Sequence, residues 1–216
     1  MKGLISLALL LSLVSCTPTA PDTLPFFNSA DFTPEWISKD TPAFKSIHTI
    51  PSFSFVDQDG DTITENLIQN KIVVADFFFT ACPGICPRLT KSMRNVQDQF
   101  RDDESIVLLS HSVTPDIDSV PRLKEYADRN QVISGRWHLL TGDRKEIYTI
   151  ARLGYFADEE VGLKKSENDF LHTENFVLVD NHRRIRGVYN GTNPAEIERL
   201  IEDIKILKRE MTDENS

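Results

Sequence analysis

Three apolar stretches in the middle of the chain predict buried strands. Residues 72–79 form the most apolar run after the start of the chain and are rich in β-branched and aromatic side chains. A short run of this composition is typical of a strand covered on both faces. Residues 105–113 and 137–140 have a similar character, so three strands are expected here.

Two segments with alternating or paired apolar runs predict β-hairpins. Residues 53–56 alternate between apolar and polar positions, and the turn at 57–60 leads into a second short strand at 62–64. Near the C-terminus, residues 176–179 and 185–189 flank a polar turn and predict another hairpin.

Helical periodicity fills the intervals between the strands. Apolar residues recur at helical spacing after Pro87, and residues 121–130 and 144–153 predict two shorter helices. Residues 158–169 form a polar insertion, and residues 195–208 predict a C-terminal helix with one aliphatic face. This order of elements predicts a three-layer α/β fold with a mixed central sheet and an N-terminal β-hairpin. The residues at helical spacing after Pro87 are Leu89, Met93, Val96 and Phe100.

The start of the chain has the features of an export signal. Met1 and Lys2 precede an apolar run over residues 3–14, which is shorter than the roughly 20 residues of a membrane-spanning helix. Cys16 follows in a context that resembles the bacterial lipobox, so residues 1–15 are expected to be a lipoprotein signal peptide and Cys16 the lipidated residue. The alternative is a plain secretory signal in which Cys16 is incidental. The first interpretation predicts a membrane-anchored, extracytoplasmic lipoprotein on the periplasmic side of a bacterial membrane.

Composition divides the remainder of the chain. Residues 16–45 are rich in proline and lack periodicity, which predicts a tether. Residues 46–208 are expected to form one domain and residues 209–216 a polar tail, because 216 residues with 40% hydrophobic content suit one globular unit. The net charge is −9 with scattered acidic residues, so no basic face is available and nucleic acid is not expected as a partner.

Cys82 and Cys86 are the two cysteines that remain once Cys16 is set aside. Three residues separate them, one more than in ordinary thioredoxin-like oxidoreductases. This spacing permits a disulfide and also allows both thiolates to face one metal ion. Because the pair follows a buried strand and precedes a helix, the helix N-terminus is expected to lower the thiol pKa values. Two thiolates favour a soft ion such as Cu(I), and an added imidazole would allow both copper oxidation states.

Five histidines compete to be the third ligand. His48 and His182 are expected at an edge and in a turn, and His138 within a strand is interpreted as structural. His111 lies late in a central strand and could approach a site at the carboxyl edge of the sheet. His172 stands just before the second hairpin, but from the residues alone an ordinary loop histidine is an equally good interpretation.

Residues 76–87, Asp-Phe-Phe-Phe-Thr-Ala-Cys-Pro-Gly-Ile-Cys-Pro, closely resemble the signature of the Sco/SenC family of copper-binding cytochrome oxidase assembly proteins. The resemblance extends from about residue 46 to about residue 208. It implies a thioredoxin-like fold, copper ligation by Cys82, Cys86 and His172, and a part in building the dinuclear copper centre of cytochrome c oxidase. It also implies that Asp76 lies near the metal loop and influences the cysteines electrostatically. The alternative for Asp76 is a buried structural carboxylate.

One segment departs from the family pattern. Residues 112–118 are similar to a family segment that usually has aspartate where Thr114 stands, whereas Asp118 fits the second acidic position. The departure puts in doubt any role assigned to the first of those acids, but not the metal site.

Three functions are compatible with these features. The first is a metallochaperone that hands copper to the copper-site subunit of cytochrome c oxidase, which needs no turnover. The second is a thiol-disulfide reductase that keeps the cysteines of that copper site reduced, for which His172 would be dispensable. The third is a peroxidase or redox sensor that uses Cys82. The motif argues against this third function. Peroxide chemistry is better served by one isolated cysteine of low pKa beside an activating arginine, and here Arg88 is the only nearby candidate.

Overall fold

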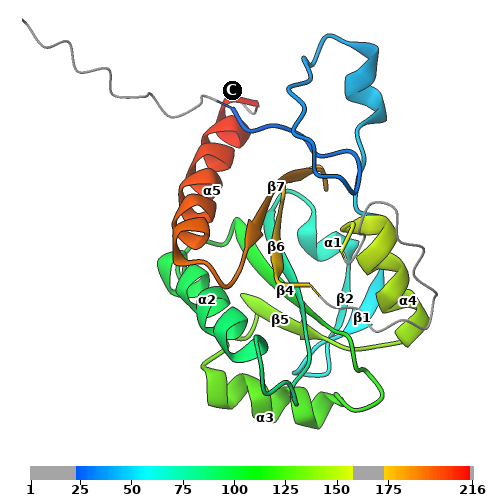
Figure 1. Cartoon of the computed structure of the whole chain (residues 1–216), viewed down its shortest axis with the longest axis vertical. Coiled ribbons are helices and arrows are strands. Elements are labelled where there is room, and N and C mark those ends of the chain that lie inside the picture. Colours follow the sequence, from blue (N-terminus) through cyan, green and yellow to red (C-terminus); the bar gives the residue numbers. More distant parts are fainter. Residues whose placement is uncertain (1–22, 158–172, 215–216) are drawn as a thin grey trace, which may run out of the picture.

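The computed structural model describes residues 23–157 and 173–214 (Figure 1). The predicted signal peptide at 1–15, the lipidation site Cys16, the polar insertion at 158–169 and the ligand His172 therefore lie outside the described residues. Within the described ranges, no helix combines the length and the apolar character needed to cross a membrane.

A five-stranded mixed sheet forms the middle layer of the domain. Its strand order is β5-β4-β3-β6-β7, in which β3, β4 and β5 run parallel and β6 and β7 continue the sheet in antiparallel pairs. The predicted three-layer fold with a mixed sheet is confirmed. The strands are β3 (Ile72–Phe78), β4 (Ile106–Ser112), β5 (Trp137–Leu140), β6 (Asn175–Val179) and β7 (Ile185–Asn190).

Helices cover both faces of the sheet (Figure 1). One face packs against α2, α3 and α5, and the other against α1, α4 and the predicted N-terminal hairpin β1–β2. The hairpin forms its own two-stranded sheet, joined to the main sheet region by a bridge between Val56 and Thr141. The elements are β1 (Ser54–Val56), β2 (Thr62–Thr64), α1 (Glu65–Ile68), α2 (Cys86–Gln99), α3 (Val120–Asn130), α4 (Arg144–Thr149) and α5 (Pro194–Glu214).

Strand β3 divides the apolar core into two halves. Its side chains alternate, so that Val74 and Phe78 belong to the cluster under α2 and α5, whereas Val73 and Phe77 belong to the cluster under α4. Every residue of β3 is buried, including Asp76, the single charged residue of the strand. Since each buried aliphatic or aromatic side chain contributes about 1.5–3 kcal/mol, the alternation fixes the register of β3 and the position of the loop that follows it.

Two helices differ from their expected extents. The helix predicted over residues 144–153 is α-helical only to Thr149 and continues as a π-helical segment over Ile150–Gly154. Helix α5 extends to Glu214, so residues 209–214 are helical and do not form the expected polar tail. Glu210 explains the extension, because its carboxylate accepts hydrogen bonds from the Leu24 amide and from Arg186.

The segment expected to be a tether also differs, from residue 23 onward. Residues 23–46, here called the N-terminal strap, pack against β7 and α5, with Leu24 and Phe26 buried. The guanidinium of Arg186 donates to the Leu24 carbonyl at 2.6 Å and lies 4.3 Å from the centre of the Phe26 ring. Arg184 lies over the same ring at 5.0 Å. Burial of these apolar groups and satisfaction of Arg186 hold the strap in place.

Truncation of Phe26 tests whether the strap is part of the fold. We expect Phe26→Ala to lower the free energy of unfolding by about 3 kcal/mol, because it removes a buried ring and exposes Arg186. Urea denaturation measures this change. Trp36→Ala, in the same segment but at a side chain that is 66% exposed, should change the free energy by less than about 0.5 kcal/mol. Equal stability of the two variants would contradict the packed strap.

Candidate metal-binding site

The two thiols lie where β3 passes into α2. Cys82 is half-buried in the connecting loop, and Cys86 is the first residue of α2 and only 4% exposed. Both are free thiols. The amide of Cys82 donates to the Phe79 carbonyl at 3.3 Å, which folds the loop back on the end of the strand. The structure therefore brings the predicted pair together at the start of a helix.

Cys82 is the more acidic thiol of the pair. Partial burial disfavours its thiolate, but hydrogen bonds from the Cys86 thiol and from the amides of Cys86, Gly84 and Ile85 outweigh burial and lower the pKa of Cys82. These amides belong to the first turn of α2 and the residues just before it, where backbone N–H groups lack helical partners. The Cys82 sulfur thus takes the place of a helix cap, since Ile85 provides no side-chain cap.

Cys86 has the opposite environment. Burial raises the pKa of the Cys86 thiol to about 12, and its hydrogen bond to Cys82 and the negative charges of Cys82 and Asp76 add to this rise. The pair therefore consists of one accessible thiol that ionises readily and one buried thiol that retains its proton.

Asp76 lies on the same face of the sheet as Cys86. Its carboxylate accepts a hydrogen bond from Ser110, whose hydroxyl in turn accepts one from the Trp137 indole at 2.8 Å. Burial raises the pKa of Asp76 to about 7, although the Ser110 hydrogen bond opposes the rise. Asp76 is therefore hydrogen-bonded within a buried Asp76–Ser110–Trp137 network, and its negative charge helps to raise the pKa of the Cys86 thiol.

A second buried carboxylate, Asp118, ties the thiol loop to the neighbouring strand. Asp118 is fully buried and accepts hydrogen bonds from the Thr80 amide at 3.2 Å, the Thr80 hydroxyl at 2.5 Å and the Ser112 hydroxyl at 2.6 Å. Thr114 donates its hydroxyl to Asp118 at 3.0 Å. A threonine here supplies a donor to Asp118, where a second carboxylate would repel it.

The contact of Asp118 with the thiol loop does not follow from the sequence pattern. Arg122 completes the arrangement, because its guanidinium donates to Thr80 at 2.6 Å and lies 3.6 Å from Asp118. The alternation of small hydroxyl residues around Asp118 was the available signal, since a buried carboxylate needs several donors.

His111 is remote from the thiols. It lies on the opposite face of the sheet, enclosed by Phe55, Phe77 and Tyr155 with ring centres 5.2–5.6 Å away. Neither ring nitrogen has a hydrogen-bond partner within the described part of the chain, and burial lowers the pKa of His111 to about 3. His111 is therefore a neutral core residue, and not the ligand at the carboxyl edge that its position in the strand allowed.

The other described histidines lie elsewhere. His138 is buried, with Nδ1 2.7 Å from the Asp57 carboxylate, which agrees with its structural interpretation. His48 is half-buried, and its Nε2 lies 2.7 Å from the Gly154 carbonyl, so it is more enclosed than an edge residue was expected to be. His182 is exposed in the turn between β6 and β7. In residues 23–157 and 173–214, no three His, Cys, Asp or Glu side chains gather as a metal-binding group.

The raised pKa of Asp76 predicts a specific pH dependence of stability. Between about pH 4 and pH 7 the unfolded chain has lost the Asp76 proton while the folded chain keeps it, so the free energy of unfolding falls as pH rises through this range. Asp76→Asn should remove this decline, which amounts to about 4 kcal/mol. Urea denaturation at several pH values measures the free energy of unfolding of Asp76→Asn. Asp116→Asn, which changes an exposed carboxylate, is the control. Parallel pH curves for wild type and Asp76→Asn would contradict the prediction.

Comparison with known proteins adds an independent line of evidence. The family model described as SCO1/SenC matches residues 42–209. The SCO1 protein homolog of Bacillus subtilis is 28% identical over 160 residues, which cover 73% of this chain and 82% of that protein.

Solved structures agree with this match. The crystal structure of a SCO1/SenC family lipoprotein from Bacillus anthracis is similar with a TM-score of 0.65 and 27% identity, over 74% of this chain and 95% of that one. The structure of Bradyrhizobium japonicum ScoI with copper bound has a TM-score of 0.58 and 23% identity, over 74% of this chain and 99% of that one, and it supports the fold. Because the family model spans most of the sequence and includes the thiol loop, the chain belongs to the SCO1/SenC family.

Proposed function

We propose that this protein binds copper through Cys82, Cys86 and His172 and delivers it to the copper-site subunit of cytochrome c oxidase, where it helps to build the dinuclear copper centre. The observation that carries the proposal is the pair of free thiols at the start of α2, within the segment that matches the family. The similar Bradyrhizobium japonicum protein was solved with copper bound.

The contacts of the described residues that follow residue 172 support His172 as the third ligand. Residue 172 is bonded to Thr173, and the next residue, Glu174, accepts a hydrogen bond at its carbonyl from the Gly191 amide at 2.8 Å. Gly191 packs so closely on α2 that a Cβ atom there would lie 2.7 Å from the Leu89 side chain. The described chain at Glu174 is therefore held near the first turn of α2, which begins at Cys86, and Glu174 is two residues from His172 in sequence.

The donor set suits copper. Two sulfurs and one imidazole nitrogen match the preference of Cu(I) for soft ligands and remain competent ligands for Cu(II). Binding would replace the proton of Cys86, so metal affinity is linked to proton release. We propose that Asp76 acts from outside the ligand set, because its charge bears on Cys86 while its carboxylate is held by Ser110.

We further propose that the protein is anchored outside the cytoplasm by lipid on Cys16, after removal of residues 1–15. The similar Bacillus anthracis protein is described as a lipoprotein. Two acyl chains supply enough buried hydrocarbon for stable attachment, whereas one chain binds only marginally.

The unequal thiols favour thiol-disulfide reduction as a second candidate. The Cys82 thiolate would attack a disulfide of the target, form a mixed disulfide and release one target thiol. Cys86 would then attack the Cys82 sulfur, release the second target thiol and leave a Cys82–Cys86 disulfide, with two electrons passed to the target. A thiol reductant would restore the pair. An accessible thiol of lowered pKa beside a buried thiol of raised pKa fits this order of attack.

Copper titration of the reduced full chain tests the three-ligand site. We expect one copper ion to bind, and His172→Ala to weaken binding about 100-fold or more and to change the thiolate-to-Cu(II) absorption bands. His182→Ala, at the exposed turn histidine, should bind as the wild type does. Unchanged affinity and spectra in His172→Ala would show that the imidazole is not a ligand.

Cells that lack the protein distinguish delivery of copper from reduction of thiols. If copper delivery is the function, neither His172→Ala nor the double variant Cys82→Ser, Cys86→Ser should restore cytochrome c oxidase activity. Restoration by His172→Ala, together with failure of the double cysteine variant, would favour the reductase instead. Immunoblots for each variant control for equal amounts of protein.

A further inference from the structure

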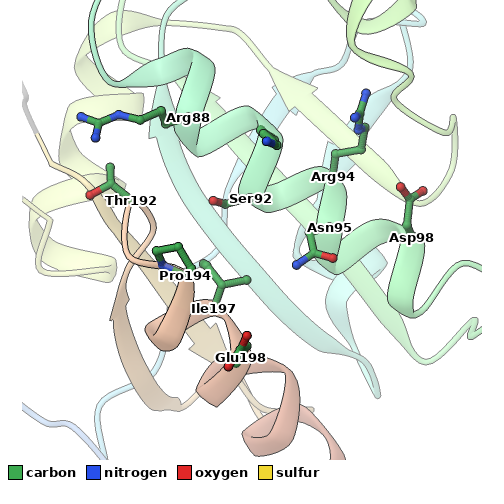
Figure 2. Close-up of a pocket in the computed structure, with 10 residues that line it drawn as sticks. Arg88, Ser92, Arg94, Asn95, Asp98, Thr192, Pro194, Ile197 and Glu198 are labelled. Carbon is green, nitrogen blue, oxygen red and sulfur yellow. The ribbon is translucent and has the colours of Figure 1, made fainter.

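A groove lies between α2 and the start of α5, beside the thiol loop (Figure 2). Its volume is about 520 Å³. Arg88, Lys91, Ser92 and Asn95 line it from α2, and Pro194 and Ile197 from α5. Ile197 is buried beneath the groove, and Pro194 is the exposed apolar residue of its α5 wall. This combination suits a short polypeptide segment better than a small rigid ligand.

The wall nearest the thiols is basic. Arg88 and Lys91 are exposed and lie one helical turn apart on α2, and Figure 2 shows Arg88 extending toward Thr192 across the groove. Within the described part of the chain, no carboxylate lies within 4.0 Å of either cation. Many other surface cations have an acidic partner, as in Lys205–Glu202 and Arg199–Glu196. The pair is therefore a local excess of positive charge on a chain of net charge −9.

The acidic lining residues do not cancel this excess. Asp98 lies at the far end of α2 in Figure 2 and is paired with Arg101 at 2.8 Å. Glu198 lies further along α5, beyond Ile197. Arg94 points away from α5 and donates to Gln131, so it adds positive charge to the rim of the groove. The groove is thus polarised, with its basic end toward the cysteines.

The position of the basic pair relates it to the thiols. Arg88 is two residues after Cys86, and Lys91 lies about 7–8 Å from Cys86 along the helix axis, from a rise of 1.5 Å per residue. A segment bound at this end of the groove would bring its protein within reach of Cys82, the more exposed sulfur.

We propose that this groove, the α2–α5 groove, docks an acidic segment of the protein that receives copper from Cys82 and Cys86. The inference rests on the proposed function, because it assigns the partner of that same site. Carboxylates of the segment pair with Arg88 and Lys91, and an apolar side chain packs on the exposed Pro194. A nucleic acid does not fit, because the described lining residues include three cations, Arg88, Lys91 and Arg94, and a chain of net charge −9 repels an extended polyanion.

Charge reversal tests the docking. The probe is the soluble copper-site domain of the oxidase subunit in its metal-free form, titrated calorimetrically with the reduced, metal-free full chain. We expect Arg88→Glu with Lys91→Glu to weaken binding about tenfold or more and to flatten its dependence on salt. Arg88→Gln with Lys91→Gln should weaken binding less, and this milder pair guards against misfolding of the first.

A matched control separates a local effect from a change of net charge. Lys145→Glu with Arg209→Glu alters the same number of exposed cations elsewhere on the surface, and should change affinity less than about twofold. Equal weakening by both reversals, no weakening by the groove variants, or no binding of the wild type to the domain would each overturn the docking proposal. Copper titration of the wild type judges the copper proposal separately, because calorimetric docking is measured without metal.

Discussion

The carboxylate of Asp118 is the interaction on which the site depends. Thr80 follows the end of β3, and Asp118 follows the end of β4, so their hydrogen bonds join the carboxyl ends of two parallel strands. Cys82 comes two residues after Thr80 and, like Ile85, packs against the core, and the buried polar contact of Thr80 helps to set the path of the thiol loop. A contact of this kind is directional, whereas apolar burial tolerates shifts of position. The directional contact therefore helps to keep the backbone amides oriented toward the Cys82 sulfur.

The fold could be predicted where the information is local. The run at 72–79 and the segment at 137–140 predicted β3 and β5 within one residue, because a strand buried on both faces is mostly apolar. The N-terminal strap could not be predicted. Only Leu24 and Phe26 of its first residues are deeply buried, and their partner Arg186 lies about 160 residues away in sequence. A proline-rich segment in which only two apolar side chains are deeply buried has no periodicity to reveal such a contact.

The properties of the site also divide into those that the sequence predicted and those that it did not. The placement of Cys82 and Cys86 followed from one buried strand and one helix, both of which are confirmed. The difference between the pKa values of the two thiols did not follow from the sequence. It depends on the burial of Cys86 where α2 packs onto the sheet and on the nearby charge of Asp76. The α2–α5 groove did not follow either, since its two walls are about 100 residues apart in sequence. Properties that arise from two distant elements appear only when both are in place.

The contact of the strap with α5 also separates the start of the described chain from the thiols. Leu24 is held at Glu210, near one end of the 21-residue helix, whereas the α2–α5 groove opens at Pro194, roughly 24 Å away along the axis at 1.5 Å per residue. The strap therefore meets the domain at the C-terminal end of α5, and the groove beside the thiols lies at the opposite end of the same helix. A single helix thus separates the point where the described chain begins from the surface where the thiols are accessible.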